Sequence, residues 1–288
     1  MNANRNYKDS VFTALFNEPD LLRELYCALG NVSLPKDVPV SINTLKNVLY
    51  MDRYNDISFE IGGKLVVLIE HQSTINPNLA LRFLFYISRV LEKIIKRKTL
   101  YSGKKVTIPR PEFYVLYNGP KSFPDNAVFK LSDLFRETDG LDIPEDTLPM
   151  LELEAKVINI NDGRNTEILN RCQKLSEYSK LIAKIYTYKE EFEDLEEAIE
   201  NAIKYCEKNG ILKEFLKIHG SEVLNMLLEE WNMDDALAVA REEGREEGHE
   251  NGCRERDNSI ARKALAKGST PEFVHEITGL SLEEIAKL

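Results

Sequence analysis

The clearest hydrophobic pattern lies between residues 54 and 72, where two short apolar segments flank a pair of glycines. Ile57–Ile61 and Leu65–Ile69 are rich in β-branched and aliphatic residues, which favour extended backbone. Gly62-Gly63 between them is a turn signal of two-residue hairpins. The pattern therefore predicts two antiparallel strands joined by a tight turn.

An acid opens this predicted hairpin, and an acid and an amide close it. Successive strand residues point to opposite faces, so Glu70 and Gln72 should share one face while His71 points to the other. Asp56, at the start of the first strand, should then lie close to both. Mg²⁺ binds one or two carboxylates and keeps several waters, so these oxygens suit a metal site. The alternative is structural, with Asp56 and Glu70 capping strand ends and pairing with nearby cations.

Before and after the hairpin, the spacing of apolar residues is typical of helices and strands. Apolar residues from about 8 to 29 follow a helical period that Asn17-Glu18-Pro19 interrupts, which predicts two short helices. Residues 79–98 predict one amphipathic helix. Further strands are predicted over residues 45–50, 112–117 and 151–158. Together these elements predict an α/β fold with a mixed sheet, in which the hairpin is antiparallel and helix-separated strands pair in parallel.

From about residue 164 the chain shows helical periods alone, which predicts an all-α C-terminal region. Between residues 240 and 253 a four-residue unit recurs, with glycine at positions 244, 248 and 252. Each glycine disfavours an isolated helix by about 1 kcal/mol relative to alanine. The segment is either a flexible charged linker or a long marginal helix whose small residues form an interhelical contact. We favour the helix, stabilised by self-association into a homo-oligomer through the C-terminal helices.

Two capping signals organise residues 259–288. Ser269-Thr270-Pro271-Glu272 opens one helix, and Ser281 with Glu284 three residues later has the capping-box pattern. Thr278-Gly279-Leu280 predicts a tight corner between the two helices. This small helical hairpin suits contact with a protein partner better than DNA reading, because the closing sequence LSLEEIAKL carries a single cation.

Composition and charge indicate an acidic, globular protein. The chain has 288 residues, of which 43% are apolar and 30% charged, as expected for a packed core. Its net charge of −10 argues against a surface that coats nucleic acid, but not against a local basic groove. The amino terminus is polar, and no apolar run approaches the ~18 residues of a membrane span. We therefore expect a cytoplasmic protein with no membrane partner.

The most basic part of the chain follows the predicted helix at 79–98. Its cations are Lys93, Lys96, Arg97, Lys98, Lys104, Lys105 and Arg110. Beside a Mg²⁺ site such a cluster would attract phosphates, so we predict that Lys93, Lys96 and Arg97 bind DNA. The alternative is a solvated helix end whose cations favour the C-terminal end of the helix dipole.

Four features occur in the order found in one group of nucleases. They are Asn55-Asp56, the strand LVVLIEHQST at Leu65–Thr74, the spaced pair Arg82 and Tyr86, and Tyr117-Asn118-Gly119. On these residues the sequence resembles the PD-(D/E)xK nuclease superfamily, and in particular its Rpn branch, the recombination-promoting nuclease or putative transposase family of bacteria. The resemblance is close over roughly residues 5 to 160. It implies a restriction-endonuclease-like mixed sheet flanked by helices.

The resemblance also implies roles for the hairpin residues. Asp56 and Glu70 would bind Mg²⁺, with Mn²⁺ or Ca²⁺ as substitutes, and His71 would add its main-chain carbonyl. Superfamily members carry a lysine at the third position, where this sequence and the Rpn branch have glutamine, here Gln72. An amide orients water but is not a base near neutral pH. Either the metal activates the water and Gln72 only aims it, or Arg82 supplies the missing cation, or activity is low.

Other candidates lie outside the hairpin. Asp9 resembles the family's N-terminal acid in its D-x-x-F pattern, although an acid at a helix N-terminus explains it equally well. Glu24 is a weaker rival for an upstream acid of the metal site. Arg82 and Tyr86 are one helical turn apart, so they share a side of the helix. They would bind a phosphate and stack on a sugar or base, or simply belong to an ordinary amphipathic helix.

These observations predict a chain of several parts. They are a nuclease-like domain at residues 1–165, a helical region at 166–240, a charged glycine-repeat helix or linker at 241–258, and a helical hairpin at 259–288. The resemblance implies a Mg²⁺-dependent DNA endonuclease that hydrolyses phosphodiester bonds in recombination, mobile DNA or phage defence. The alternative is a catalytically weak protein of the same fold that binds DNA or partners through its C-terminal helices.

Overall fold

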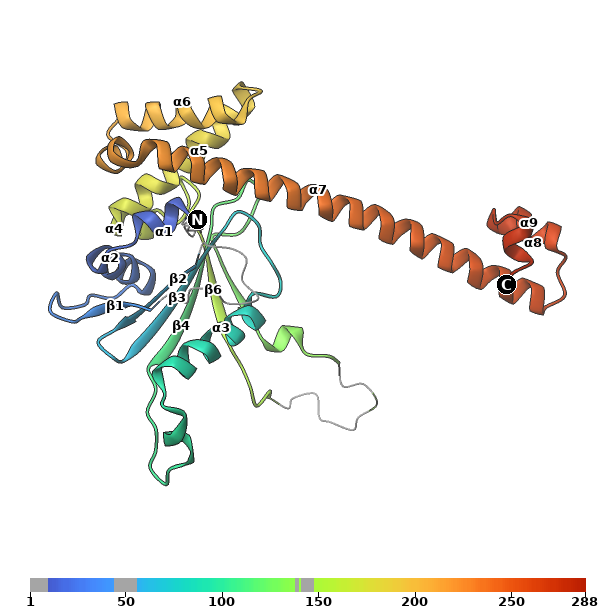
Figure 1. Ribbon diagram of the computed structural model, residues 1–288, viewed down its shortest axis with the longest axis horizontal. Coiled ribbons are helices and arrows are strands. Elements are labelled where there is room, and N and C mark those ends of the chain that lie inside the picture. Colours follow the sequence, from blue (N-terminus) through green and yellow to red (C-terminus); the bar gives the residue numbers. More distant parts are fainter. Residues whose placement is uncertain (1–9, 44–55, 138–139, 141–147) are drawn as a thin grey trace, which may run out of the picture. The chain divides into compact units, whose positions relative to one another are not determined.

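A mixed sheet forms the centre of the part of the chain before residue 229 (Figure 1). The computed structural model describes residues 10–43, 56–137, 140 and 148–288, except for the side chains of residue 56 and of most residues from 233 to 251. Within these ranges the sheet has six strands in the order β1-β2-β3-β4-β6-β5. The strands are β1 (Val40–Ile42), β2 (Asp56–Ile61), β3 (Leu65–Gln72), β4 (Arg110–Tyr117), β5 (Asn126–Lys130) and β6 (Glu154–Asn159).

The predicted hairpin is confirmed. β2 and β3 pair antiparallel, with Asp56 opposite Glu70 and Ile61 opposite Leu65. Gly62 and Gly63 have φ angles of 58° and 66°, the left-handed values that a type I′ turn requires at both central positions. Because this turn matches the twist of the strands, it sets the register that aligns Asp56 with Glu70.

The predicted parallel pairing is confirmed as well. β3 pairs in parallel with β4, and β4 with β6, so the sheet is mixed. The edge strands β1 and β5 each pair antiparallel with a neighbour and were not predicted. Both are short, which leaves little alternation to recognise. The strand predicted at residues 45–50 lies outside the described residues.

α3 (Leu79–Ile94) covers one face of the sheet. Its apolar side packs on β3, β4 and β6, in a core that includes Val66, Leu68, Phe83, Val90, Val115 and Val157. The predicted helix extends to residue 98, but the observed helix ends at Ile94, because Ile95 is extended with φ −94° and ψ 126°. A short 3₁₀ helix, η1 (Arg97–Tyr101), follows before the chain turns back into β4.

Several helices lie on the other side of the sheet (Figure 1). They are α1 (Val11–Leu15), α2 (Pro19–Gly30), α4 (Thr166–Arg171), α5 (Gln173–Glu191) and α6 (Leu195–Lys208). The predicted break at Asn17-Glu18-Pro19 separates α1 from α2, with Pro19 at the first position of α2, where its missing N–H costs nothing. The Ser10 hydroxyl caps α1 by accepting a hydrogen bond from the Thr13 amide at 3.2 Å.

The chain divides into two compact units, Met1–Leu228 and Glu229–Leu288. In the second unit α8 (Pro271–Thr278) and α9 (Leu282–Ile285) share a small core with the end of α7 (Lys213–Ala266), formed by Ala261, Val274, Leu280 and Ile285. Thr270 caps α8, Ser281 and Glu284 form the predicted capping box, and Gly279 has the left-handed φ of 71°. The glycine repeat is helical within α7, as predicted. Self-association stays a prediction.

None of the helices that the structure describes has both the length and the apolar character needed to cross a membrane.

Candidate functional site

A buried polar group forms on β3, on the face that α3 covers. Glu70 and Gln72 are 2% and 4% exposed, and they continue the inward row begun by Val66 and Leu68. The Gln72 amide nitrogen donates a hydrogen bond to Glu70 Oε1. The Arg82 guanidinium of α3 lies 2.8 Å from the same oxygen. A buried carboxylate therefore has one cation and one amide donor on a single oxygen.

Asp56 is aligned with this group by the backbone. It lies directly opposite Glu70 in the β2–β3 register, and opposed residues of antiparallel strands share a face. Its side chain lies outside the described part of the structure, as does the whole of Asp9. The register agrees with the predicted closeness of Asp56 and Glu70. The metal-binding roles of both residues stay predictions, as does the role of the His71 carbonyl.

The donor groups fit a hard cation. Gln72 Oε1 is buried and accepts no hydrogen bond from the described residues, while its amide nitrogen is engaged by Glu70. An acceptor oxygen in this position can take a cation, a water or a donor from a substrate. Among the described residues no three His, Cys, Asp or Glu side chains gather as metal ligands. The described donors at this place are the Glu70 carboxylate and the Gln72 amide oxygen, and the backbone register brings Asp56 opposite Glu70.

His71 points away from this group, as strand alternation predicts. Its ring stacks on Phe12 with a centroid distance of 5.1 Å and meets the edge of Tyr178 at 5.3 Å. The Tyr178 hydroxyl lies 3.3 Å from His71 Nε2. Burial lowers the pKa of His71 to about 4, and a hydrogen bond with Asn118 opposes the shift. The side chain therefore belongs to the core opposite α3.

His71 should make the folded state sensitive to acid. Its folded pKa of about 4 lies below the ordinary value of 6.5 expected in the unfolded chain. Below pH 6.5 the unfolded chain therefore binds more protons, so the free energy of unfolding falls as the pH drops. From this one group we expect a loss of about 2 kcal/mol between pH 7 and pH 5.

Urea unfolding in EDTA at the two pH values measures this effect. His71→Phe is the matched variant, because phenylalanine keeps an aromatic ring beside Phe12 and does not titrate. The wild type should lose about 2 kcal/mol more than the variant over this pH range. Equal losses in the two proteins would contradict a buried neutral histidine.

Two predicted DNA contacts of α3 lie in different environments. Arg82 is at the N-terminal end of the helix and pairs with Glu70. Tyr86, one turn along, is 3% exposed and packs in the core beneath the helix. Its burial favours the interpretation of an ordinary amphipathic helix over a side chain that stacks on a base.

The basic cluster does not lie beside Glu70. Lys93, Lys96 and Arg97 are exposed and stand at the C-terminal end of α3, while Arg82 stands near its start. β4 begins with Arg110 opposite Leu65, so the chain that leaves α3 returns at the start of β3. The expectation that these cations adjoin the metal site is corrected, because a parallel crossover carries the helix back along the strands.

Glu24 has a structural contact. Its Oε1 accepts a hydrogen bond at 3.1 Å from the backbone N–H of Gln173, the first residue of α5. The first amides of a helix have no partner within the helix, so an acid here stabilises its N-terminus. This contact explains Glu24 without a metal.

The strand ends beside the polar group are tightly joined. The Asn118 amide donates to the Gln72 carbonyl at 3.1 Å, and the Asn161 side-chain amide donates to the Gly119 carbonyl at 3.0 Å. A Cβ on Gly119 would stand 1.7 Å from the Ser73 carbonyl oxygen. The pattern of residues 112–117 predicts the strand but not this packing. A glycine two residues past the end of a buried strand is the signal that could have indicated a close backbone approach.

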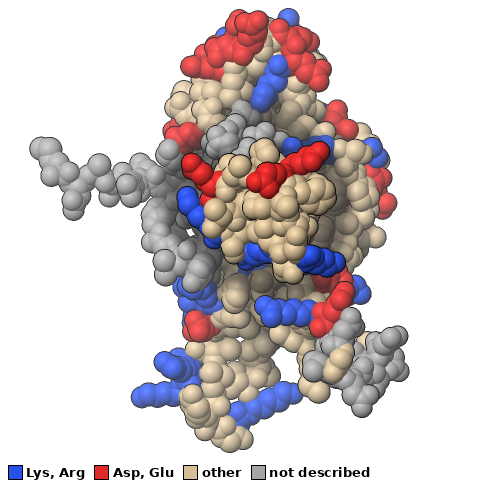
Figure 2. All heavy atoms as spheres, turned by 90° about the vertical axis from the view of Figure 1, so that its right-hand side faces the viewer, with Lys and Arg blue, Asp and Glu red and all other residues tan. Residues whose placement is uncertain are grey.

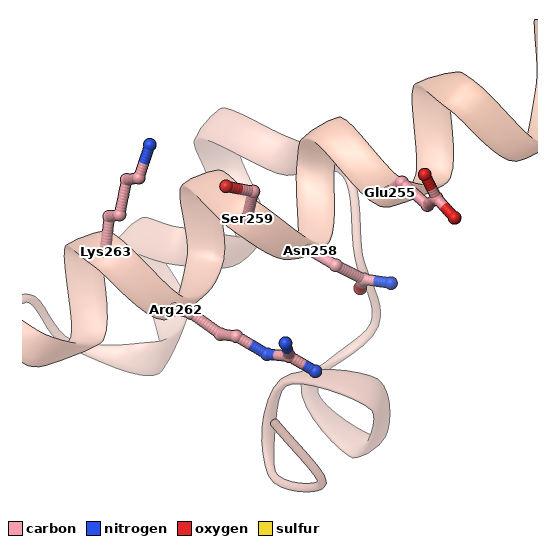
Figure 3. Close-up of a pocket in the computed structure, with 5 residues that line it drawn as sticks. All are labelled: Glu255, Asn258, Ser259, Arg262 and Lys263. Carbon is pink, nitrogen blue, oxygen red and sulfur yellow. The ribbon is translucent and has the colours of Figure 1, made fainter. Parts of the chain in front are cut away.

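A separate hollow lies against α7 in the second unit (Figure 3). It is lined by Glu255, Asn258, Ser259, Arg262 and Lys263. Asn258 and Arg262 point to one side of the helix, and Lys263 points to the other. One acid and two cations on a single helix do not supply paired carboxylates, so this hollow lacks the groups that make β3 a candidate site.

Comparison with known proteins identifies a family. Residues 27–231 match the model of a family described as "Putative transposase, YhgA-like". No curated protein and no solved structure matches the chain. The matched range contains β2, β3, α3 and β4, and therefore Glu70, Gln72 and Arg82.

Proposed function

The chain belongs to the family of YhgA-like putative transposases, and from this membership we propose that it is a Mg²⁺-dependent DNA endonuclease. The family suggests a nuclease-type enzyme with a role in mobile DNA. The reaction we propose is hydrolysis of a phosphodiester bond, in recombination, in the movement of mobile DNA or in defence against phage.

One observation supports this function above the others. A buried glutamate sits beside an amide and a guanidinium, at the place where the β2 backbone brings Asp56 opposite it. Burial of a carboxylate is costly unless it is paired, and carboxylate and amide oxygens are the ligands that a hard cation takes. Bound by Asp56 and Glu70, Mg²⁺ would supply Lewis-acid stabilisation of charge on the phosphate.

In this proposal the protein's own side chains orient the attacking water and bind the phosphate. Gln72 Oε1 can accept a hydrogen bond from the attacking water and so fix its direction, but the amide cannot remove the proton. Arg82 carries a planar guanidinium that matches phosphate geometry. Once a cation neutralises Glu70, the same guanidinium can turn to a phosphate oxygen.

A second function rests on the contact between Arg82 and Glu70. The Arg82 guanidinium lies 2.8 Å from Glu70 Oε1 and balances the charge of the carboxylate. The pair could therefore be structural, with no need for a metal. A protein of this kind would bind DNA without cutting it. Cleavage and binding therefore have to be measured separately.

Plasmid nicking tests the proposed function. The wild type should nick supercoiled DNA with Mg²⁺ and not with EDTA. Asp56→Asn and Glu70→Gln should each lower the rate by about 100-fold or more, because metal stabilisation is worth several kcal/mol and each 1.36 kcal/mol is a factor of ten. Glu60→Gln is the matched control, since Glu60 lies on β2 opposite Val66, away from Glu70.

Circular dichroism must show that each variant is folded. Equal nicking by all four proteins, or nicking that persists in EDTA, would exclude the proposed site. DNA binding by the wild type without any nicking would support the binding protein instead.

A further inference from the structure

The segment between α3 and β4 projects from the sheet (Figure 1). We call residues 93–109 the basic arm. Positions 96 to 105 are all exposed, and η1 contains no buried residue. The arm is braced by its own hydrogen bonds: the Thr99 amide donates to the Lys96 carbonyl at 2.8 Å, and the Ser102 amide to the Thr99 carbonyl at 3.1 Å. Its shape is thus set locally, and its side chains are available to a partner.

The basic arm is strongly positive in an acidic protein. Its cations are Lys93, Lys96, Arg97, Lys98, Lys104 and Lys105. No acid occurs between residues 93 and 109, whereas the whole chain has a net charge of −10. Arg110, just beyond the arm, pairs with Glu112, but within the described part of the chain none of the six cations forms an ion pair. Figure 2 shows Lys and Arg side chains gathered at the lower end of the molecule, where Figure 1 places this segment.

Large apolar side chains stand among these cations. Tyr101 is 85% exposed, Leu100 59% and Ile108 49%. Such side chains normally gain by burial, so their exposure in one cluster marks a contact surface. An aromatic ring interleaved with lysines is suited to a partner that offers both phosphates and flat bases.

The cations continue along α3 toward Glu70. Arg82, Arg89 and Lys93 follow spacings of seven and four residues, and Lys96 comes just after the helix end at Ile94. At about 100° per residue the three helical cations fall within about 40° of arc, so they form a single stripe that leads to the basic arm. From Arg82 to Lys93 the rise is about 17 Å, which corresponds to about five base pairs of duplex DNA.

We propose that the basic arm is a second DNA-binding element, which docks on the duplex about five base pairs from the phosphate at Glu70. The position of that phosphate rests on the proposed function. Its lysines contact backbone phosphates, and Tyr101 and Leu100 enter the groove. Duplex DNA is a linear polyanion, so it can contact the basic arm and the α3 stripe at the same time. A protein partner is disfavoured because interface cores are depleted in lysine. Binding to an anionic membrane would use the basic arm but would leave the α3 stripe without a role.

Fluorescence anisotropy with a labelled duplex tests this inference without cleavage. All proteins carry Glu70→Gln and are measured in EDTA, so nuclease activity plays no part. The arm variant replaces Lys96, Lys98, Lys104 and Lys105 with glutamine. We expect affinity to fall roughly tenfold or more at about 0.1 M salt, and the slope of log K against log salt to shrink by about two to four. Tyr101→Ala alone should weaken binding several-fold with an unchanged slope, because it removes a groove contact and no charge.

The control replaces four exposed lysines of α6 and the start of α7, Lys204, Lys208, Lys213 and Lys217. Its affinity should match that of the parent. If the arm variant and the control variant lose affinity for DNA equally, the inference is overturned, since the net charge of the protein alone would then determine the affinity. Binding to phosphatidylserine vesicles that depends on the arm, with DNA binding that does not, would overturn it in favour of a membrane. Because no step requires cutting, a failed nicking assay leaves this result standing.

Discussion

Replacing Gly119 with alanine should leave little folded protein, with a loss of more than about 4 kcal/mol in the free energy of unfolding. A Cβ at this position would stand 1.7 Å from the Ser73 carbonyl oxygen and 2.7 Å from the Ser73 carbonyl carbon. Both are backbone atoms, so no side-chain rotation relieves the clash. The strands must instead move apart.

The consequence reaches the candidate site directly. Ser73 follows Gln72, and the Asn118 amide next to Gly119 donates to the Gln72 carbonyl. Separation of these strand ends would break that bond and displace Gln72 from Glu70. Any folded fraction of Gly119→Ala should therefore have lost its nicking activity as well.

Soluble yield and urea unfolding followed by circular dichroism measure this effect. Gly103→Ala is the matched control, because a Cβ on Gly103 meets nothing within 4 Å. The control should stay within about 0.5 kcal/mol of the wild type. Wild-type stability in Gly119→Ala would show that the backbone at Ser73 yields at little cost.

The hairpin could be predicted because several local signals agree. Alternation, β-branched residues and the Gly62-Gly63 turn all indicate the same pair of strands, and a two-residue turn leaves a single register. That register also determines that Glu70 and Gln72 point to one face of the sheet and His71 to the other. The caps of α8 and α9 were predictable for the same reason, since their residues lie within four positions of each other.

Features that depend on distant parts of the chain could not be predicted in this way. The contact of Arg82 with Glu70 joins a helix to a strand, and the basic cluster lies far from the site because β4 runs parallel to β3. Helical spacing puts Tyr86 near Arg82 but does not say that this side of the helix faces the sheet. The edge strand β5 is only five residues long, and it alternates three exposed with two partly buried positions, which is too short a run for a clear period.

Arg82→Gln should destabilise the protein by about 3 to 5 kcal/mol in EDTA, the usual effect of removing one partner from a buried ion pair. Glu70 is 2% exposed and the Arg82 guanidinium lies 2.8 Å from its Oε1. The Gln72 amide also donates to this oxygen, but an amide carries no charge that could replace the one removed. A divalent cation at Glu70 would replace the lost charge, so Mg²⁺ should stabilise the variant more than the wild type.

Thermal and urea unfolding with and without Mg²⁺ separate the two roles of Glu70. In the wild type Arg82 competes with the metal for one oxygen, which weakens Mg²⁺ binding; in Arg82→Gln that competition is gone, and stabilisation grows with the ratio of metal concentration to Kd. Arg89→Gln, seven residues along the same helix, controls for loss of a cation from α3. If Mg²⁺ shifts all three proteins equally, Glu70 does not bind the metal. If Mg²⁺ stabilises Arg82→Gln more than the other two proteins, the Arg82 guanidinium and the metal bind the same Glu70 oxygen in turn.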